Sequence, residues 1–262
     1  MLDNAATRCV LLTPPKCEPV SSLLPPTPDS RGMRALNIEV GNKLAILAGD
    51  FLLARASVTL ASLRDTDVIM LLSTVIEHLV TGEVMQMTAR PEELLSFEYY
   101  TRKTHLKTAS LMAQSSKAVA LLGGEGEETA LLAYEYGRHL GLAFQYVDDV
   151  LDFTGTARSL GKPALNDLRS GLATAPVLYA ARQFPALAKL VQRRFKEEGD
   201  VEQARLWVAD SQGIEETRAL AAEHAAHARA ALDAFPPAAS ERAQLARSGL
   251  AELTHRVLRR SK

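Results

Sequence analysis

A cluster of oxygen-bearing side chains is the part of this sequence best suited to chemistry. It consists of Gln145, Asp148, Asp149 and Asp152, within a run of helical periodicity from about Glu127 to Phe153. At 100° per residue the four side chains share one stripe of that helix. The opposite side is apolar and consists of Phe144, Val147, Val150 and Leu151. The pattern predicts a core helix that presents three carboxylates and an amide on one face.

Carboxylates this close together repel one another, and each costs desolvation free energy if it is buried. A hard divalent cation would offset that cost. Oxygen ligands suit Mg²⁺, which binds through one or two carboxylates and substrate phosphates. The bare pattern is also compatible with a solvated acidic face on a surface helix, so the flanking residues have to decide between the two interpretations.

The flanking residues extend the pattern to GRHLGLAFQYVDDVLDFTGTARSLGKP, residues 137–163. This run resembles the second aspartate-rich motif of the trans-prenyltransferases, the all-helical polyprenyl diphosphate synthases. It is closest in style to the long-chain, solanesyl and decaprenyl type that makes quinone side chains. The resemblance implies an all-α fold, an antiparallel helical bundle around a central cavity known as the isoprenoid synthase fold. It covers roughly Gly41 to the C-terminus.

The resemblance also implies roles for individual residues. The KTASL run, residues 107–111, resembles the motif in which Lys107 and Thr108 hold an allylic diphosphate. The segment GEVMQM, residues 82–87, resembles one that lines the cavity, although its polar pair Glu83 and Gln86 is equally suited to an interhelical hydrogen bond. The implied catalytic residues are Asp148, Asp149 and Lys107. The implied substrate-binding residues are Lys107, Thr108, Gln145, Lys162 and Gln86. The implied ligands of Mg²⁺ are Asp148, Asp149 and Asp152.

The activity implied by the resemblance is head-to-tail condensation. Magnesium neutralises the diphosphate of an allylic substrate, which leaves as pyrophosphate. The double bond of isopentenyl diphosphate attacks the resulting carbocation, and loss of a proton leaves a chain longer by one isoprene unit. A homodimer, or a heteromer with a related synthase subunit, is the expected assembly. A plastid or a mitochondrion is a candidate compartment by this resemblance, with the cytoplasm as the alternative.

The helices that must position these groups follow from apolar spacing and from Gly, Pro and capping residues. The predicted helices span residues 42–63, 68–89, 96–122 in two pieces, 127–153, 173–182, 185–195, 201–210, 213–235 and 240–260. Asp65 and Asp67 are predicted to cap the second of them. Small residues in the first helix suit close packing, which makes it a candidate for the subunit contact.

Residues 1–36 differ from the rest and hold six of the twelve prolines. We expect them to be disordered, either as a transit peptide or as an aberrant start, and we expect residues 37–262 to form the helical domain. Asp148 and Asp149 are the only adjacent aspartates, whereas the family carries a further, upstream aspartate-rich motif. The alternative hypothesis is therefore a truncated, non-catalytic chain or a partner subunit of a heteromeric synthase.

The composition limits other functions. The net charge of −1 gives no indication of a nucleic-acid partner. We find no continuous apolar run long enough to span a bilayer. Cys9 and Cys17 suggest neither a disulfide framework nor a metal site. His224 and His227 have the spacing of metal ligands, but no third ligand lies nearby in the sequence, so a structural or surface role is expected for them.

Overall fold

The structure, a computed structural model, describes residues 36–155 and 165–260. All regular elements within these residues are helices, which confirms the predicted all-α class. Contacts divide the chain into two compact units, Met1–Thr59 and Leu60–Lys262, which are described separately. Lys162 and nearly all of the proline-rich segment lie outside the described residues.

The first unit contains α2 (Leu36–Val40) and most of α3 (Asn42–Ser62). α3 and the next helix, α4 (Thr66–Thr88), are both long and apolar enough to cross a bilayer by length and mean hydropathy. Charged residues interrupt both helices, so the sequence has no continuous apolar run there, but they do not lower the mean hydropathy below that of a membrane span. Two helices that meet these criteria are weak evidence for a membrane, because core helices of soluble proteins also meet them.

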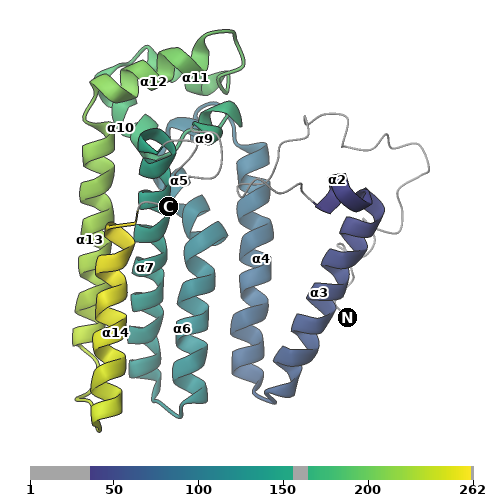
Figure 1. The fold of residues 1–262 in the computed structure, drawn as a ribbon, viewed down its shortest axis with the longest axis vertical. Helices are drawn as coiled ribbons and strands as arrows, with labels where there is room; N and C mark the ends of the chain where they lie inside the picture. Colours follow the sequence, from purple (N-terminus) through teal and green to yellow (C-terminus); the bar gives the residue numbers. More distant parts are fainter. Residues whose placement is uncertain (1–35, 156–164, 261–262) are drawn as a thin grey trace. The chain divides into compact units, whose positions relative to one another are not determined.

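Five long helices of the second unit lie side by side (Figure 1). Along the row α4 is followed by α6 (Ser110–Leu122), α7 (Glu127–Thr154) and α13 (Gly213–Asp233), and α14 (Glu241–Leu258) packs against both α13 and α7. Short helices lie across one end of this row, namely α10 (Ala175–Gln183), α11 (Leu187–Gln192) and α12 (Asp200–Asp210). α7 packs against both α6 and α13, so it is the central helix of the row.

The core surrounds the C-terminal half of α7. Leu142 and Tyr146 of α7 are at most 2% exposed and belong to a cluster that continues into α9 and α10. Burying a large apolar side chain contributes about 1.5–3 kcal/mol relative to leaving it in water. The buried cluster therefore fixes the rotation of α7 about its axis, and with it the directions of the polar side chains on that helix.

The helix predicted over residues 96–122 consists of three segments: α5 (Phe97–Thr104), a π-helical turn η3 (His105–Ala109), and α6. Ser96 caps α5 by accepting a hydrogen bond from the Tyr99 amide. Asp65 caps α4 as predicted and accepts hydrogen bonds from two amides of its first turn. Three short segments were not predicted as separate elements: α2, η2 (Glu93–Leu95) and α9 (Asn166–Arg169).

Candidate functional site

A pocket of about 170 Å³ lies between α4, the α5–η3 segment, α7 and the chain around residues 167–174. Its polar lining combines two lysines with two carboxylates and neutral hydrogen-bonding groups. The residues that matter below are Lys103, Lys107, Thr108, Gln145, Asp149 and Asp167. Positive and negative groups in one pocket suit a ligand that carries phosphate oxygens together with a cation.

The π-helical turn places Lys107 and Thr108 toward different neighbouring helices. The Lys107 ammonium lies 2.6 Å from Glu83 Oε2 and donates to Gln86 Oε1 at 3.0 Å, both on α4. Thr108 donates to Gln145 Oε1 on α7 at 3.0 Å. The wide turn of a π-helix is frequently found at functional sites. Here it lets two adjacent residues reach opposite walls of the pocket.

Close helix contacts hold this turn in place. A Cβ atom built on Gly82 of α4 would lie 2.7 Å from Lys107 Cγ, and one built on Gly141 of α7 would lie 2.6 Å from Ala109 Cα. Real Cβ atoms do not approach other atoms so closely. The two glycines therefore allow α4 and α7 to pack closely against η3 on both sides.

Asp149 is the buried carboxylate of the pocket, with 1% of its surface exposed. Gln145 Nε2 donates to its Oδ1 at 2.9 Å, and the Tyr100 hydroxyl donates to its Oδ2. Burial raises the pKa of the Asp149 carboxyl to about 7, although these two hydrogen bonds act in the opposite direction. Thr108, Gln145 and Asp149 thus form one continuous chain of hydrogen bonds along the pocket wall.

Asp148 faces a different neighbour. Its Oδ1 lies 2.6 Å from the guanidinium of Arg260, two residues beyond the end of α14. The same guanidinium lies 3.9 Å from the centre of the Phe144 ring, the range of a cation–π contact. Asp148 therefore joins α7 to the C-terminal segment, and it is not among the residues that line the 170 Å³ pocket.

Asp152 is 1% exposed and caps α9. Its two carboxylate oxygens accept hydrogen bonds from the backbone amides of Asn166 and Asp167, each at 3.1 Å. Its carbonyl oxygen accepts from the amide of Leu165, whose φ of 61° is left-handed. Such a conformation is costly for a branched residue, so the contacts with Asp152 hold the turn that brings Asp167 to the pocket.

The single stripe expected on α7 is thus divided among three neighbours. Asp148 and Asp149 are adjacent in sequence, so they point about 100° apart around the helix axis. One faces the C-terminal segment and the other faces the pocket, while Asp152 faces α9. Helical periodicity predicts the side of α7 on which the three aspartates lie. The elements that pack against that side decide what each carboxylate contacts.

The sequence did not predict Tyr100, Lys103 and Asp167 as residues of the pocket. Lys103 lies one helical turn before Lys107, and burial lowers the pKa of its ammonium while Asp149 acts to raise it. Tyr100 lies a further turn toward the N-terminus. The i, i+4 spacing of Lys103 and Lys107, which puts both side chains on one face of a helix, could have indicated Lys103. Asp167 carried no signal, because only the fold of the 165–169 turn brings it to the site.

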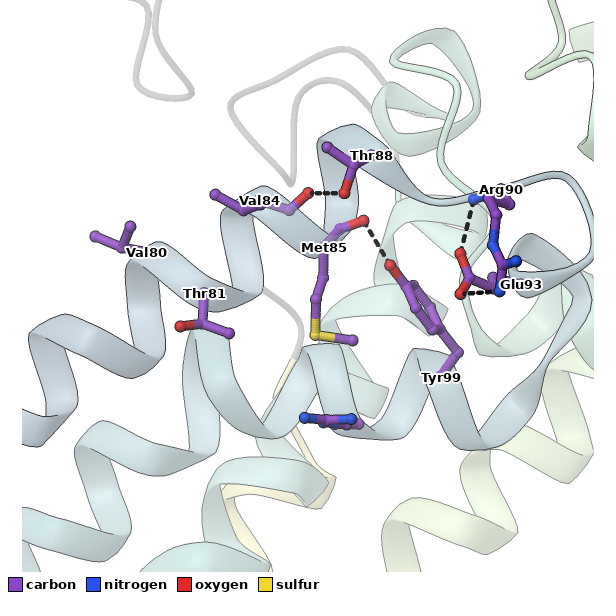
Figure 2. A pocket seen from close by; sticks show the side chains of 9 residues that line it. Val80, Thr81, Val84, Met85, Thr88, Arg90, Glu93 and Tyr99 are labelled. Atoms are coloured by element: carbon purple, nitrogen blue, oxygen red, sulfur yellow. Dashed lines mark hydrogen bonds and ion pairs between the residues drawn. The ribbon is translucent and has the colours of Figure 1, made fainter. Parts of the chain in front are cut away.

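A second pocket, of about 570 Å³, is lined by α4, the segment before α5, and α5 itself (Figure 2). Its walls include Val84, Thr88 and Tyr99, whose hydroxyl donates to the carbonyl of Met85 at 2.7 Å. The charged side chains Arg90 and Glu93 hydrogen-bond to each other. The pocket is wide and open, and Glu93 is its one carboxylate beside Arg90 and Arg102, so its lining lacks the pair of carboxylates that suits a divalent cation in the smaller pocket.

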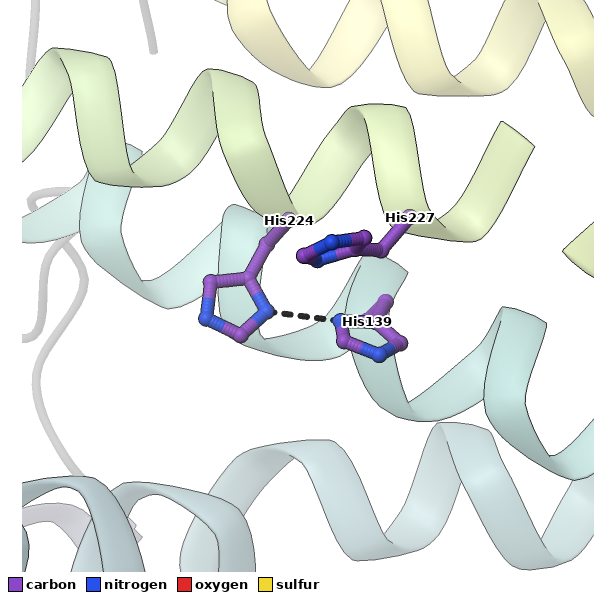
Figure 3. Close-up of side chains that lie close together, drawn as sticks. All are labelled: His139, His224 and His227. Carbon is purple, nitrogen blue, oxygen red and sulfur yellow. Dashed lines mark hydrogen bonds between the residues drawn. The ribbon is translucent and has the colours of Figure 1, made fainter. Parts of the chain in front are cut away.

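His224 and His227 do have a third histidine beside them, contrary to the sequence expectation. His139 of α7 donates or accepts a hydrogen bond with His224 through the two Nδ1 atoms, 2.7 Å apart (Figure 3). The potential ligand atoms of the three side chains all lie within 4.8 Å of one another. His139 is 85 residues away from His224 in sequence, so only the packing of α7 against α13 reveals the group.

Comparison with known proteins gives consistent results. A family profile described as polyprenyl synthetase matches residues 30–207. The rice protein "Solanesyl-diphosphate synthase 1, mitochondrial" (Oryza sativa subsp. japonica) is 51% identical over 232 residues, which are 88% of this chain and 54% of the rice protein. The chain thus spans about half the length of the curated relatives it matches.

Solved structures share the fold. The apo form of an Arabidopsis medium/long-chain length prenyl pyrophosphate synthase is 50% identical and superposes with a TM-score of 0.78, covering 86% of this chain and 76% of that one. A polyprenyl synthase from Caulobacter crescentus CB15, complexed with calcium and isoprenyl diphosphate, is 34% identical, with a TM-score of 0.78 and coverage of 88% and 70%.

Proposed function

This chain belongs to the polyprenyl synthetase family, and we propose that it acts in the head-to-tail condensation of isopentenyl diphosphate onto an allylic diphosphate. The observation that carries the proposal is the 170 Å³ pocket, in which Lys103 and Lys107 face Asp149 and Asp167. The family membership supports a prenyltransferase, and the names of the relatives favour a long-chain product for quinone side chains. The rice relative's mitochondrial name favours the mitochondrion within the expected organelles.

In the proposed complex Lys107 binds the allylic diphosphate. Its ammonium now contacts Glu83 and Gln86, two oxygen-bearing groups that a phosphate can replace. Lysine is a point charge with three donors, which suits the oxygens of a diphosphate. Thr108 Oγ1 is held by Gln145 at the opposite wall of the pocket and supplies a neutral hydroxyl group there. Gln86 orients the ammonium before the substrate arrives.

The donor set of the pocket fits a hard divalent cation, for which we propose Mg²⁺. Asp149 is buried, and the Gln145 amide oxygen and Asp167 line the same pocket. These three residues would hold the ion, with Asp148 and Asp152 as the further proposed ligands from the aspartate motif. When bound, the cation neutralises negative charge on the diphosphate. Asp148 and Asp152 have to give up contacts with Arg260 and α9 to take part.

The residues of the chain then have two tasks in the reaction. Lys103 and Lys107 stabilise the negative charge that accumulates on the pyrophosphate as the allylic carbon–oxygen bond breaks. The π-helical turn keeps Lys107 and Thr108 on fixed walls, so little reorganisation is needed at that moment. The double bond of isopentenyl diphosphate forms the new carbon–carbon bond, and one proton leaves the product.

A second candidate function is that of a partner subunit in a heteromeric synthase. The observation that favours it is that the 262 residues hold a single pair of adjacent aspartates, Asp148 and Asp149, whereas the family resemblance implies two facing carboxylate clusters. In that case the pocket binds diphosphate, but turnover requires a complete synthase chain. We propose association for both candidate functions, as a homodimer or as a heteromer with a related synthase subunit.

Two measurements separate the candidates. Calorimetric titration with a non-reactive allylic diphosphate analogue should show binding that strengthens when Mg²⁺ is added. Incorporation of radiolabelled isopentenyl diphosphate is then measured for the chain alone and after addition of a complete synthase. Turnover by the chain alone supports the enzyme, and turnover only in the mixture, above that of the added synthase, supports the partner subunit. Absence of analogue binding with and without Mg²⁺ would show that both are wrong.

A further inference from the structure

Three histidines converge between α7 and α13 (Figure 3). His139 lies on α7, and His224 and His227 lie one turn apart on α13. His139 and His224 are partly buried, while His227 is exposed. This group lies apart from the pocket described above and takes no part in the proposed condensation.

Small residues bring the two helices together at this point. Ala221, Ala225 and Ala228 of α13 are at most 4% exposed and alternate with the histidine positions. With only methyl groups in the seam, the helix axes approach closely and the larger imidazole rings meet at its edge. The rings of His139 and His227 are 4.9 Å apart between centroids, as are those of His139 and His224.

We propose that His139, His224 and His227 form a binding site for Zn²⁺ that ties α7 to α13. Imidazole nitrogen is a preferred ligand of zinc, and three histidines leave a fourth position for water. With zinc–nitrogen distances of about 2.0–2.1 Å, tetrahedral ligand atoms lie roughly 3.3 Å apart. The 2.7 Å separation of His139 and His224 has to open slightly, and the exposed His227 has to swing inward.

The hydrogen bonds around His139 define the proton arrangement before zinc binds. The Arg138 guanidinium, which can only donate, lies 2.8 Å from His139 Nε2. That nitrogen is therefore the acceptor, so the ring proton is on Nδ1 and is donated to Nδ1 of His224. Burial first, and then Arg138, lower the pKa of His139 to about 3. The pair is thus a neutral donor and acceptor, and neutral imidazole is the form that binds metal.

Glu135 is placed to accept the remaining ring proton of a zinc-bound His139. Coordination through Nδ1 of His139 moves the ring proton to Nε2, which then needs an acceptor. Glu135 Oε2 lies 3.5 Å from that nitrogen, one turn earlier on α7. A carboxylate that accepts the second ring proton of a metal-bound histidine is the usual outer partner in zinc sites. Arg138, which also contacts Glu135, shifts from His139 to this carboxylate alone.

The site is separate from the proposed Mg²⁺ site in position and in chemistry. His139 precedes Asp148 by nine residues, which is about 13 Å along an α-helix. Nitrogen ligands favour zinc, whereas the oxygen ligands of the pocket favour magnesium. A metal that binds only the folded chain stabilises it in proportion to the logarithm of its concentration over its dissociation constant. Zinc should therefore stabilise the α7–α13 pair, the most extensively packed pair of helices.

The test is a Zn²⁺ titration of the untagged 262-residue chain, followed by calorimetry and by thermal unfolding. We expect one zinc ion per chain and a melting temperature that rises with zinc concentration. His139→Ala and His227→Ala should each weaken binding by at least about tenfold, and Glu135→Gln by roughly 10–100-fold without changing the stoichiometry. His227 is exposed, so its variant keeps the fold even if the His139 variant does not.

Two controls locate the ion. His255→Ala removes an exposed histidine of α14 outside the cluster, and Asp149→Asn alters the carboxylate pocket; both should leave zinc affinity unchanged. Co²⁺ in place of zinc should give the intense visible absorption of a four-coordinate site, and His227→Ala should remove it. Absence of binding, unchanged binding in both histidine variants, or binding lost in Asp149→Asn would each overturn the proposal.

Discussion

Two regions of the helix α7 differ in what their polar side chains contact. Toward its C-terminus α7 directs oxygen atoms of Gln145 and Asp149 into a pocket with two lysines. Near its middle it directs the nitrogen atoms of His139 toward two histidines of α13. The first group is contiguous in sequence and extends a recognisable motif, whereas the second is assembled from two helices far apart in the chain. One helix can thus hold two sites of opposite ligand preference because its faces pack against different neighbours.

The largest expected effect is a loss of turnover when the pocket carboxylate Asp149 of α7 is changed. Asp149→Asn removes the charge of the buried carboxylate while keeping its size, and should lower turnover, in the chain alone or in the mixture with a complete synthase, by roughly 10²–10³-fold. Initial rates of isopentenyl diphosphate incorporation measure it. Asp210→Asn, an exposed aspartate on α12, is the matched control, and an equal loss in both variants would contradict the assignment.

A somewhat smaller effect tests the lysine that faces the carboxylates. Lys107→Gln keeps hydrogen-bonding capacity and removes the ammonium, so analogue binding should weaken by roughly 10–100-fold, the range for a lost hydrogen bond to a charged group. Calorimetry measures the dissociation constant. Lys189→Gln, a lysine of α11 outside the pocket, should bind as the unaltered chain does. Equal affinity for the analogue in Lys107→Gln and the unaltered chain would remove Lys107 from the site.

The next prediction concerns the helix contact that positions the pocket. In Gly141→Ala the new methyl group would meet Ala109, because a Cβ there lies 2.6 Å from Ala109 Cα. Overpacking of this kind costs about 1–3 kcal/mol of unfolding free energy. Urea unfolding measures the loss. Gly249→Ala, at a position of α14 with open space around it, should be neutral or stabilising, and the opposite order of the two variants would show that the α7–η3 contact is not tight.

A smaller loss of stability is expected from the cap of α9. Asp152→Ala removes both acceptors of the Asn166 and Asp167 amides. Loss of such a cap costs about 1 kcal/mol, with a range of roughly 0.5–2 kcal/mol. Chemical denaturation measures it, with Asp233→Ala at the exposed end of α13 as the control. If Asp152→Ala unfolds at the same denaturant concentration as the unaltered chain, the carboxylate does not support the turn.

The smallest effect is expected in the histidine group. Without zinc, His227→Ala should change the unfolding free energy by no more than about 0.5 kcal/mol, because the side chain is exposed. Incorporation rates measured in a metal-chelated buffer supplemented with Mg²⁺ should also be unchanged. A large loss of activity there would mean that the two regions of α7 are coupled and not independent.

Local sequence signals determined much of the fold. Apolar spacing and capping residues gave the long helices to within a few residues, because helix periodicity and N-cap hydrogen bonds depend on residues three or four positions apart. The same locality placed the carboxylates of α7 in one sector and put Lys107 and Thr108 together. Residues adjacent in sequence are neighbours in any tertiary structure. Motifs of this kind can therefore be recognised from the sequence alone.

Only the tertiary structure decided which atoms meet. It separated Asp148, Asp149 and Asp152 among three neighbours, because residues in one sector of a helix can still face different elements. It brought Lys103 and Asp167 to the pocket and formed α9, whose left-handed Leu165 depends on contacts with Asp152. It also joined His139 to His224 across 85 residues. These contacts between distant residues depend on how the helices pack. The packing is determined by small and apolar residues that are themselves distant in sequence from the polar groups brought together.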